Sequence, residues 1–223
     1  MLTVNEEFLL LTAGNPDGTA TVLVVDLPKS RLGIRIAMTG GSLMELALRD
    51  RIETDVDQLW LRDSSPTGEK AVDDVLARIV AMSHGHAAKS PITEIIKKLE
   101  EIDSYQLALD SLNARGLVRQ RTQRFFWLFR EEHIVVIDLE VVRGIRKRVC
   151  DVLFEEEFPS PRDVCLISLL DATRKFRRVV APERVQQAVE QTKRYVNLDL
   201  VGRNVANHVS SMIESLQKYG DIV

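Results

Sequence analysis

The strongest constraint on the fold is a set of apolar residues that recur at the spacing of an α-helix. The clearest case is SPITEIIKKLEEI, residues 90–102, where Ser90 is a suitable N-cap and Pro91 suits the first helical position. An amphipathic helix of this kind must bury its apolar face against other elements. The stripe that forms this face consists of Ile92, Ile95, Ile96, Leu99 and Ile102.

Similar patterns predict further helices on both sides of this segment. Thr3 and Glu6 form a capping-box pattern at the start of the chain. Ser65 and Pro66 are expected to begin another helix, and Gly116 is a typical left-handed helix stop after a stripe of Tyr105, Leu109 and Leu112. The other predicted helices cover about 4–12, 43–49, 69–82, 142–152, 161–172, 181–196 and 205–216.

Two segments predict β-hairpins instead. Residues 51–66 end at a Pro turn, and residues 117–139 are rich in aromatic and β-branched side chains. Residues 19–27 are also compatible with one or two short strands. Because 45% of the residues are apolar, the chain can bury a sizeable core. We predict a mainly α fold: a single compact helical domain over residues 1–223, with about eight or nine helices and one or two protruding β-hairpins.

The chain carries none of the motifs common in enzymes. A nucleophile elbow, a phosphate-binding glycine loop, HExxH and a dinucleotide fingerprint are all missing. His84 and His86 provide too few ligands for a metal ion. The acidic pairs are expected at helix ends or on solvent faces: Glu6–Glu7, Glu100–Glu101 and Glu155–Glu157. We therefore predict that the protein is not an enzyme and has no cofactor and no metal.

The cellular compartment follows from what the sequence lacks. Cys150 and Cys165 are not arranged as CxxC, so we expect two small buried residues rather than a disulfide or a zinc site. The longest apolar runs fall well short of the roughly 20 residues that a spanning helix needs, and the first residues do not have the order of a signal peptide. We expect a cytoplasmic protein.

The most informative constellation is ARGLVRQRTQRFFWLFR, residues 114–130, in which arginines surround an aromatic triplet with no acidic residue among them. Guanidinium groups bind lipid phosphates in bidentate geometry, and aromatic rings are stable at the headgroup boundary. An anionic surface contributes roughly 1 kcal/mol per nearby basic residue, so four or five arginines give reversible adhesion. The candidate lipid-binding residues are therefore Arg115, Arg119, Arg121, Arg124, Phe125, Phe126 and Trp127.

Other interpretations of this segment stay open. Alternate aromatic residues along a strand can face the core or another subunit, with the arginines in water. Residues 111–223 are net basic, with 19 Lys and Arg against 15 Asp and Glu, and two further basic runs lie in this half. These runs form one broad cationic face if they lie beside the hairpin; they are Arg143, Arg146, Lys147 and Arg148, and Arg174, Lys175, Arg177 and Arg178.

Several blocks together resemble the Golgi phosphoprotein 3 family. They are LTVNEEFLLL, GGSLMELALRDRIE, SPTGEKAVDDVLARI, LNARGL and FFWLF, in this order and over most of the chain. The resemblance implies a compact, mostly helical domain with a protruding β-hairpin that is able to associate into oligomers. Eukaryotic members bind phosphatidylinositol 4-phosphate at the Golgi and link glycosyltransferases to vesicle coats. This chain is similar to a bacterial-type member without their long basic N-terminal tail.

The family's headgroup site is not matched residue by residue. It uses a tryptophan and an arginine upstream of the block that resembles ELALR, where ungapped counting places Ser30 and Thr39. Two further arginines precede the block that resembles LNARGL, where counting places Ile102 and Tyr105. An insertion would bring Arg31 or Arg35 into their place. The family's hairpin carries apolar residues that enter the membrane, so membrane contact transfers better than headgroup specificity.

Three hypotheses follow. The first is a non-catalytic peripheral membrane or adaptor protein whose hairpin contacts anionic lipid. The second is a winged-helix-like nucleic-acid-binding unit over residues 91–130, but its recognition helix offers Gln106, Asn113, Arg115 and the acidic Asp110, too few cations, so no nucleic acid is expected. The third is a self-associating module that forms a homo-oligomer through the hairpin and binds no lipid.

Overall fold

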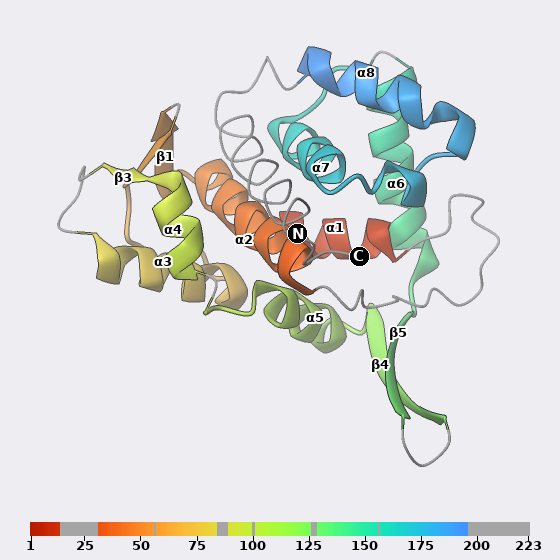
Figure 1. The fold of residues 1–223 in the computed structure, drawn as a ribbon, viewed down its shortest axis with the longest axis horizontal. Coiled ribbons are helices and arrows are strands. Elements are labelled where there is room, and N and C mark those ends of the chain that lie inside the picture. The colour runs from red at the N-terminus through yellow and green to blue at the C-terminus, as the bar shows by residue number, and fades with distance from the viewer. Residues whose placement is uncertain are drawn as a thin grey trace.

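The computed structural model describes residues 1–13, 31–55, 57–83, 89–99, 101–125, 129–155 and 157–195. They form eight α-helices, two 3-10 turns and two small antiparallel sheets, which confirms the predicted mainly α class with hairpins (Figure 1). The predicted strands over 19–27 and the predicted helix over 205–216 lie outside these residues. The helices are α1 (Val4–Thr12), α2 (Arg31–Leu48), α3 (Lys70–Met82), α4 (Ile92–Leu99), α5 (Ser104–Ala114), α6 (Leu139–Phe154), α7 (Pro161–Ala172) and α8 (Val185–Tyr195).

Helix α1 lies at the centre of the helical body, with α2, α5, α6 and α7 packed against it (Figure 1). The predicted capping box is confirmed: the Glu6 N–H donates to the Thr3 hydroxyl at 3.3 Å, and the Thr3 N–H donates to the Glu6 carboxylate at 2.7 Å. Glu6 and Glu7 are 1% and 4% exposed. The prediction that this pair lies on a solvent face is therefore wrong, because the surrounding helices leave α1 no solvent face.

Helix α2 is much longer than the predicted helix over 43–49. The pair Gly40–Gly41 weakens the local helical signal, but packing against α1 requires a small residue there. A Cβ atom on Gly41 would lie 2.1 Å from Oδ1 of Asn5. The Asn5 amide donates to the Met38 carbonyl and to the Ser42 hydroxyl, both at 2.8 Å. The glycine thus permits the close approach that joins the first two helices.

The first predicted hairpin is confirmed, and a third strand extends it. β1 (Ile52–Asp55) pairs antiparallel with β2 (Gln58–Leu61), and β2 pairs with β3 (Ser90–Pro91). Ser90 and Pro91 were predicted as the N-cap and first residue of a helix, and this is wrong because they pair with Leu59 and Gln58 in the sheet. The predicted apolar stripe of α4 is confirmed, with four of its residues buried: Ile92, Ile95, Ile96 and Leu99.

The start of α3 also differs from the prediction. Its N-cap is Glu69, not Ser65. The Ser65 hydroxyl instead donates to Asp63 at 2.5 Å. Asp73, in the first turn of α3, accepts hydrogen bonds from the N–H and the hydroxyl of Thr67 at 2.6 and 2.7 Å. The helix therefore begins where a carboxylate inside it organises the preceding turn.

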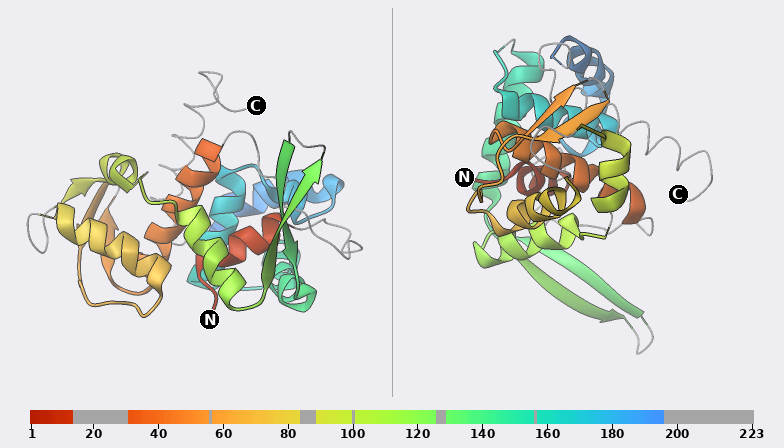
Figure 2. Two further views of the ribbon diagram at one scale, coloured as in Figure 1. Left: turned by 90° about the horizontal axis from the view of Figure 1, so that it is seen from below. Right: turned by 90° about the vertical axis from the view of Figure 1, so that its left-hand side faces the viewer.

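Helix α5 ends as predicted. Gly116 has a φ of +72°, and the Leu117 N–H donates to the Leu112 carbonyl at 3.0 Å, so the helix closes with a left-handed residue. The chain then enters the second predicted hairpin, β4 (Val118–Phe125) and β5 (Phe129–Val136). Two further views show this hairpin leaving the helical body next to α5 (Figure 2).

The last three helices cover the other side of α1. The predicted stripe of α6 is confirmed, since Val142, Ile145, Val149 and Val152 are all buried. Helix α7 is buried from residue 163 to residue 170, and the predicted capping position Ser160 holds its N-terminus through Asp163. Helix α8 packs on α6 and α7. Cys165 is buried and Cys150 half-buried, and neither forms a disulfide.

Candidate membrane-contact hairpin

The β4–β5 hairpin projects from the helical body (Figures 1 and 2). Its register runs from the pair Val118 and Val136 at the base to the pair Phe125 and Phe129 at the far end. The base is anchored in the core, because Val118, Ile134 and Val136 are only 2–3% exposed. The anchored base fixes where the hairpin leaves the body, and the longer part of the ladder extends beyond it.

The structure places four of the predicted lipid-binding residues on β4. Arg119 is exposed and pairs with Val135, Arg121 pairs with His133, and Arg124 pairs with Arg130. Phe125 occupies the last position of the strand. Strand alternation puts positions 119, 121 and 125 on one face and position 124 on the other. Phe126 and Trp127 lie outside the described residues.

The return strand brings acidic residues that the arginine-rich segment itself lacks. Glu131 pairs with Gln123, and Glu132 pairs with Thr122. Arg130 adds a fourth cation to those of β4. The paired strands therefore carry four arginines against two glutamates, a net positive hairpin whose charge is smaller than that of β4 alone.

Arg115, the first predicted residue, lies just before the hairpin and has partners within the protein. Its guanidinium donates to the Glu69 carboxylate at 2.7 Å and to the Met1 carbonyl at 3.1 Å. Its Nε lies 3.3 Å from Oε1 of Glu6. Arg115 thus joins the hairpin base to α1 and to the start of α3, and binding a lipid phosphate would require it to leave these partners.

The positions that correspond to the family's headgroup site hold uncharged side chains in the part that the structure describes. Thr39 is buried in α2, while Ile102 and Tyr105 are half-buried beside the start of α5. The two helices meet there, since the Ser42 hydroxyl lies 3.5 Å from that of Ser104. Arg35, one turn before Thr39, is half-buried, and Ser30 lies outside the described residues.

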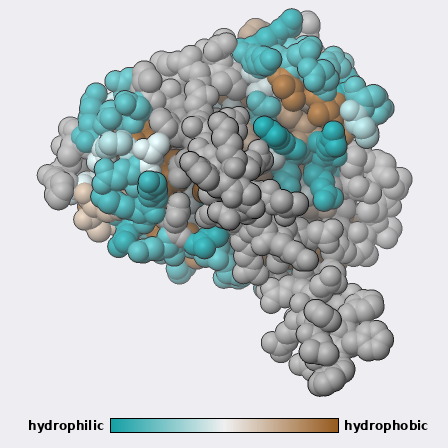
Figure 3. Space-filling view, in the orientation of Figure 1, coloured by the Kyte–Doolittle hydropathy of each residue, from teal (hydrophilic) through white to brown (hydrophobic). Residues whose placement is uncertain are grey.

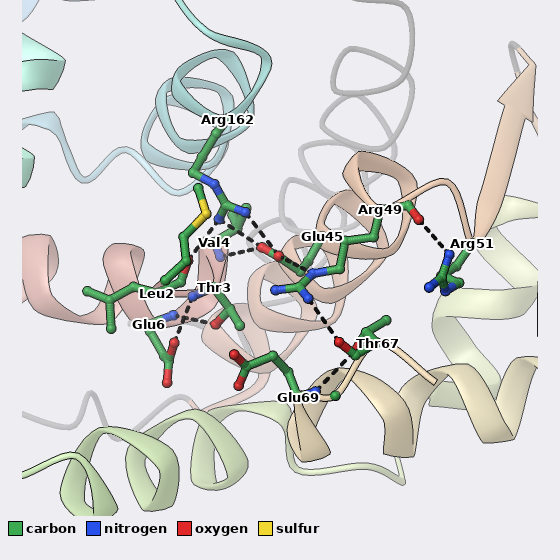
Figure 4. Close-up of polar contacts among 12 residues, drawn as sticks. Leu2, Thr3, Val4, Glu6, Glu45, Arg49, Arg51, Thr67, Glu69 and Arg162 are labelled. Atoms are coloured by element: carbon green, nitrogen blue, oxygen red, sulfur yellow. Dashed lines mark hydrogen bonds and ion pairs between the residues drawn. The ribbon is translucent and has the colours of Figure 1, made fainter. Parts of the chain in front are cut away.

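A buried polar cluster, missed by sequence reasoning, joins the two ends of the helical body (Figure 4). Glu45 is 1% exposed and accepts hydrogen bonds from Arg49 Nε at 2.7 Å and from the Val4 N–H at 2.8 Å. Arg162, at the start of α7, donates to both Glu45 oxygens at 2.9 and 3.0 Å and to the Leu2 carbonyl at 3.1 Å. The available signal was a single glutamate within the apolar pattern LMELAL.

The electrostatics of this cluster follow from its hydrogen bonds. Burial alone raises the pKa of Glu45, but the hydrogen bonds from Arg162 and Arg49 outweigh burial and hold that pKa below its ordinary value. A second buried acid, Glu7, contacts Arg148 of α6 at 2.5 Å, and Arg148 also contacts Asp163 of α7 at 2.6 Å. These ion pairs join helices, and their acids have no exposed cleft in which to transfer protons.

The rest of the described surface offers little that suggests another site. Its exposed large apolar side chains are Met1, Val80, Ile137 and Phe158. The face in Figure 3 is mainly hydrophilic where it is coloured, with a limited hydrophobic area at the end that carries α7 and α8. No group of three metal-ligating side chains occurs among the described residues, and His84 and His86 lie outside them. None of the described helices is both long and apolar enough to cross a bilayer.

The basic runs noted in the sequence do not join the hairpin in one face. Lys147 pairs with Asp151 at 2.5 Å, and Arg143 pairs with Glu140. The run at 174–178 precedes α8, and α8 and the hairpin lie at opposite ends of the molecule in Figure 1 and in the right-hand view of Figure 2. The cationic groups are therefore separated in space.

Comparison with known proteins places the chain in a family. No curated protein matches it. The family model for Golgi phosphoprotein 3 (GPP34) matches residues 4–212, nearly the whole chain. This match confirms the resemblance seen in the sequence blocks, and it spans the described helices and the hairpin. The chain therefore belongs to the Golgi phosphoprotein 3 family, a family of non-catalytic adaptors.

Proposed function

We propose that this protein is a peripheral membrane adaptor whose β4–β5 hairpin contacts anionic lipid. The observation that carries the proposal is the projecting hairpin, anchored by Val118, Ile134 and Val136 and net positive along its strands. Arginines at the membrane surface gain electrostatic attraction, and the aromatic triplet at 125–127 supplies apolar contact. Family membership supports a non-catalytic, lipid-dependent role.

The lipid specificity that we expect is charge rather than one headgroup. Eukaryotic family members bind phosphatidylinositol 4-phosphate, but Thr39, Ile102 and Tyr105 bring no cation to the corresponding positions. Guanidinium groups on a hairpin bind any accessible lipid phosphate. We therefore expect vesicles of equal charge to bind equally, whether the charge comes from phosphatidylserine or from phosphatidylinositol 4-phosphate.

Vesicle co-sedimentation tests the proposal. The wild-type protein is compared with Arg119→Gln/Arg121→Gln on neutral phosphatidylcholine vesicles and on vesicles with added phosphatidylserine. At roughly 1 kcal/mol per arginine, the double variant should bind anionic vesicles about 30-fold more weakly. The matched control is Lys70→Gln/Lys97→Gln, which removes two exposed charges from α3 and α4. Equal binding of all three proteins, or equal binding to neutral and anionic vesicles, contradicts the proposal.

The apolar contribution is tested separately. Phe126→Ala/Trp127→Ala removes the rings but no charge, so it should weaken vesicle binding while leaving its dependence on salt unchanged. Light scattering on the same variant addresses the rival hypothesis of self-association through the hairpin. If the variant has a lower mass than the wild type but binds vesicles equally well, the hairpin is an oligomer contact and the lipid proposal fails.

A further inference from the structure

A second cationic surface lies on the segment that joins α7 to α8. Residues 173–184, called here the α7–α8 segment, contain five basic side chains and one acidic one, Glu183. The segment contains two 3-10 turns, Phe176–Arg178 and Pro182–Arg184, and both pack against α8. The basic residues are Arg174, Lys175, Arg177, Arg178 and Arg184.

The backbone of this segment is held in place by buried apolar side chains. Phe176 and Val179 are 1% exposed, and Val180 is 3% exposed. Arg177 and Arg178 directly follow the Phe176 anchor and are both exposed. The core contacts therefore present these cations from a fixed turn, which lowers the entropy lost when they bind a partner.

The cations of this turn are not neutralised by nearby acids. No ion pair joins Arg177 or Arg178 to a carboxylate in the described part of the chain, whereas Arg78 on α3 pairs with Glu101 at 2.8 Å. Burial, and then the nearby Arg178 guanidinium, lower the pKa of Lys175. Like charges are thus held together, an arrangement that an anionic ligand would stabilise.

The segment also retains a strained residue. Arg174 has a φ of +55°, and it follows α7 at the position where Gly116 follows α5. The Arg174 N–H donates to the Asp171 carbonyl and the Lys175 N–H donates to the Leu170 carbonyl, as in a left-handed helix stop that favours glycine. Strain of this kind is often retained where the side chain has a function.

We propose that the α7–α8 segment is a docking surface for an extended acidic peptide of a client protein. Arginine guanidinium groups bind Asp and Glu carboxylates in bidentate geometry. The choice of a soluble partner over lipid rests on the proposed membrane-contact hairpin, because the segment packs on α8, at the opposite end of the molecule. With the hairpin on a membrane, this surface faces away from it and is accessible to a soluble chain.

Fluorescence anisotropy tests the proposal. The probe is a labelled peptide of alternating Glu and Ser, and the reference probe has Gln in place of every Glu. Loss of one charge-assisted hydrogen bond weakens binding by at least about tenfold, so Arg177→Gln/Arg178→Gln should do so. Lys70→Gln/Lys97→Gln should bind the acidic probe like the wild type. If the wild type does not prefer the acidic probe, or if both double variants bind equally, the proposal is overturned.

Two further arms separate this surface from the hairpin and from other partners. Phe126→Ala/Trp127→Ala should lose vesicle binding and keep peptide binding, so each proposal can fail without the other. Arg174→Gly should keep the fold and bind the peptide more weakly. If Arg177→Gln/Arg178→Gln instead loses binding to anionic vesicles, or if the wild type prefers a single-stranded RNA to the peptide, the partner is not an acidic peptide and the proposal is overturned.

Discussion

Arg162 offers the sharpest test of how the helical body is held together. It is 12% exposed and donates to both oxygens of the buried Glu45 and to the Leu2 carbonyl. Arg162→Met keeps the apolar stem and removes the guanidinium. The variant leaves Glu45 with two remaining donors, Arg49 and the Val4 N–H.

The expected loss follows from the cost of a buried charge without its main partner. Breaking a buried ion pair costs about 3–5 kcal/mol, and the two remaining donors place the change near the lower end, about 3 kcal/mol. For a chain of 223 residues this corresponds to a decrease in Tm of about 6–12 °C. Arg62→Met is the control, because Arg62 is exposed and its acids lie 3.8 and 3.9 Å away. The control should change stability by less than about 0.5 kcal/mol.

Urea unfolding of the wild type, both single variants and Glu45→Gln/Arg162→Met provides the measurement. A coupling energy of at least about 1 kcal/mol between the two positions is expected. A loss below about 1 kcal/mol for Arg162→Met, or additive single variants, would refute the view that this pair holds α2 to α7.

The same pair predicts a dependence on pH. Because the folded-state pKa of Glu45 is lowered, its contribution to stability is complete above its unfolded pKa, near 4.3, and is lost as the pH falls through the lowered value. Without Arg162 this contribution is already absent at neutral pH. The stability difference between wild type and Arg162→Met should therefore narrow as the pH falls below about 4, and a constant difference from pH 7 to pH 3 contradicts the assignment.

Further predictions concern glycine positions and can be checked by the same unfolding measurements. Gly41→Ala should cost about 1–3 kcal/mol, because its Cβ would lie 2.1 Å from Asn5 Oδ1. Gly144→Ala, in α6 with no atom within 4 Å of the new Cβ, should instead stabilise the protein by about 0.5–1 kcal/mol. Gly116→Ala should cost about 1 kcal/mol because of its positive φ, although the space around it is open. Arg174→Gly should not lower stability, since glycine relieves the positive φ at that position; a clear loss would show that the arginine stabilises the turn.

The sequence predicted those elements whose signals are local. The capping box of α1, the stripes of α4 and α6, the helix stop at Gly116 and both hairpins all depend on residues within a few positions of one another. Such signals survive in a single sequence because helix and strand periodicity require only the chain's own neighbours.

The features that were missed depend on contacts between distant residues. The length of α2 depends on Asn5, and the pairing of Ser90 with Leu59 turns an expected helix cap into a strand. Glu45 and Arg162 are 117 residues apart, so their pairing has no local pattern. For the candidate site, sequence reasoning identified the projecting hairpin, but the intramolecular partners of Arg115 became visible only in the fold.

The enclosure of α1 has a consequence for biosynthesis. This helix is made first, yet its carboxylates and apolar side chains are covered by elements made much later: Arg148 comes 141 residues after Glu7, and Arg162 comes 160 residues after Leu2. At about 5–20 residues per second, a ribosome needs roughly 8–32 s to synthesise that length. During this interval the future centre of the protein is an unprotected amphipathic segment, which is a natural binding site for a chaperone, and completion of α7 is the step that ends this exposure.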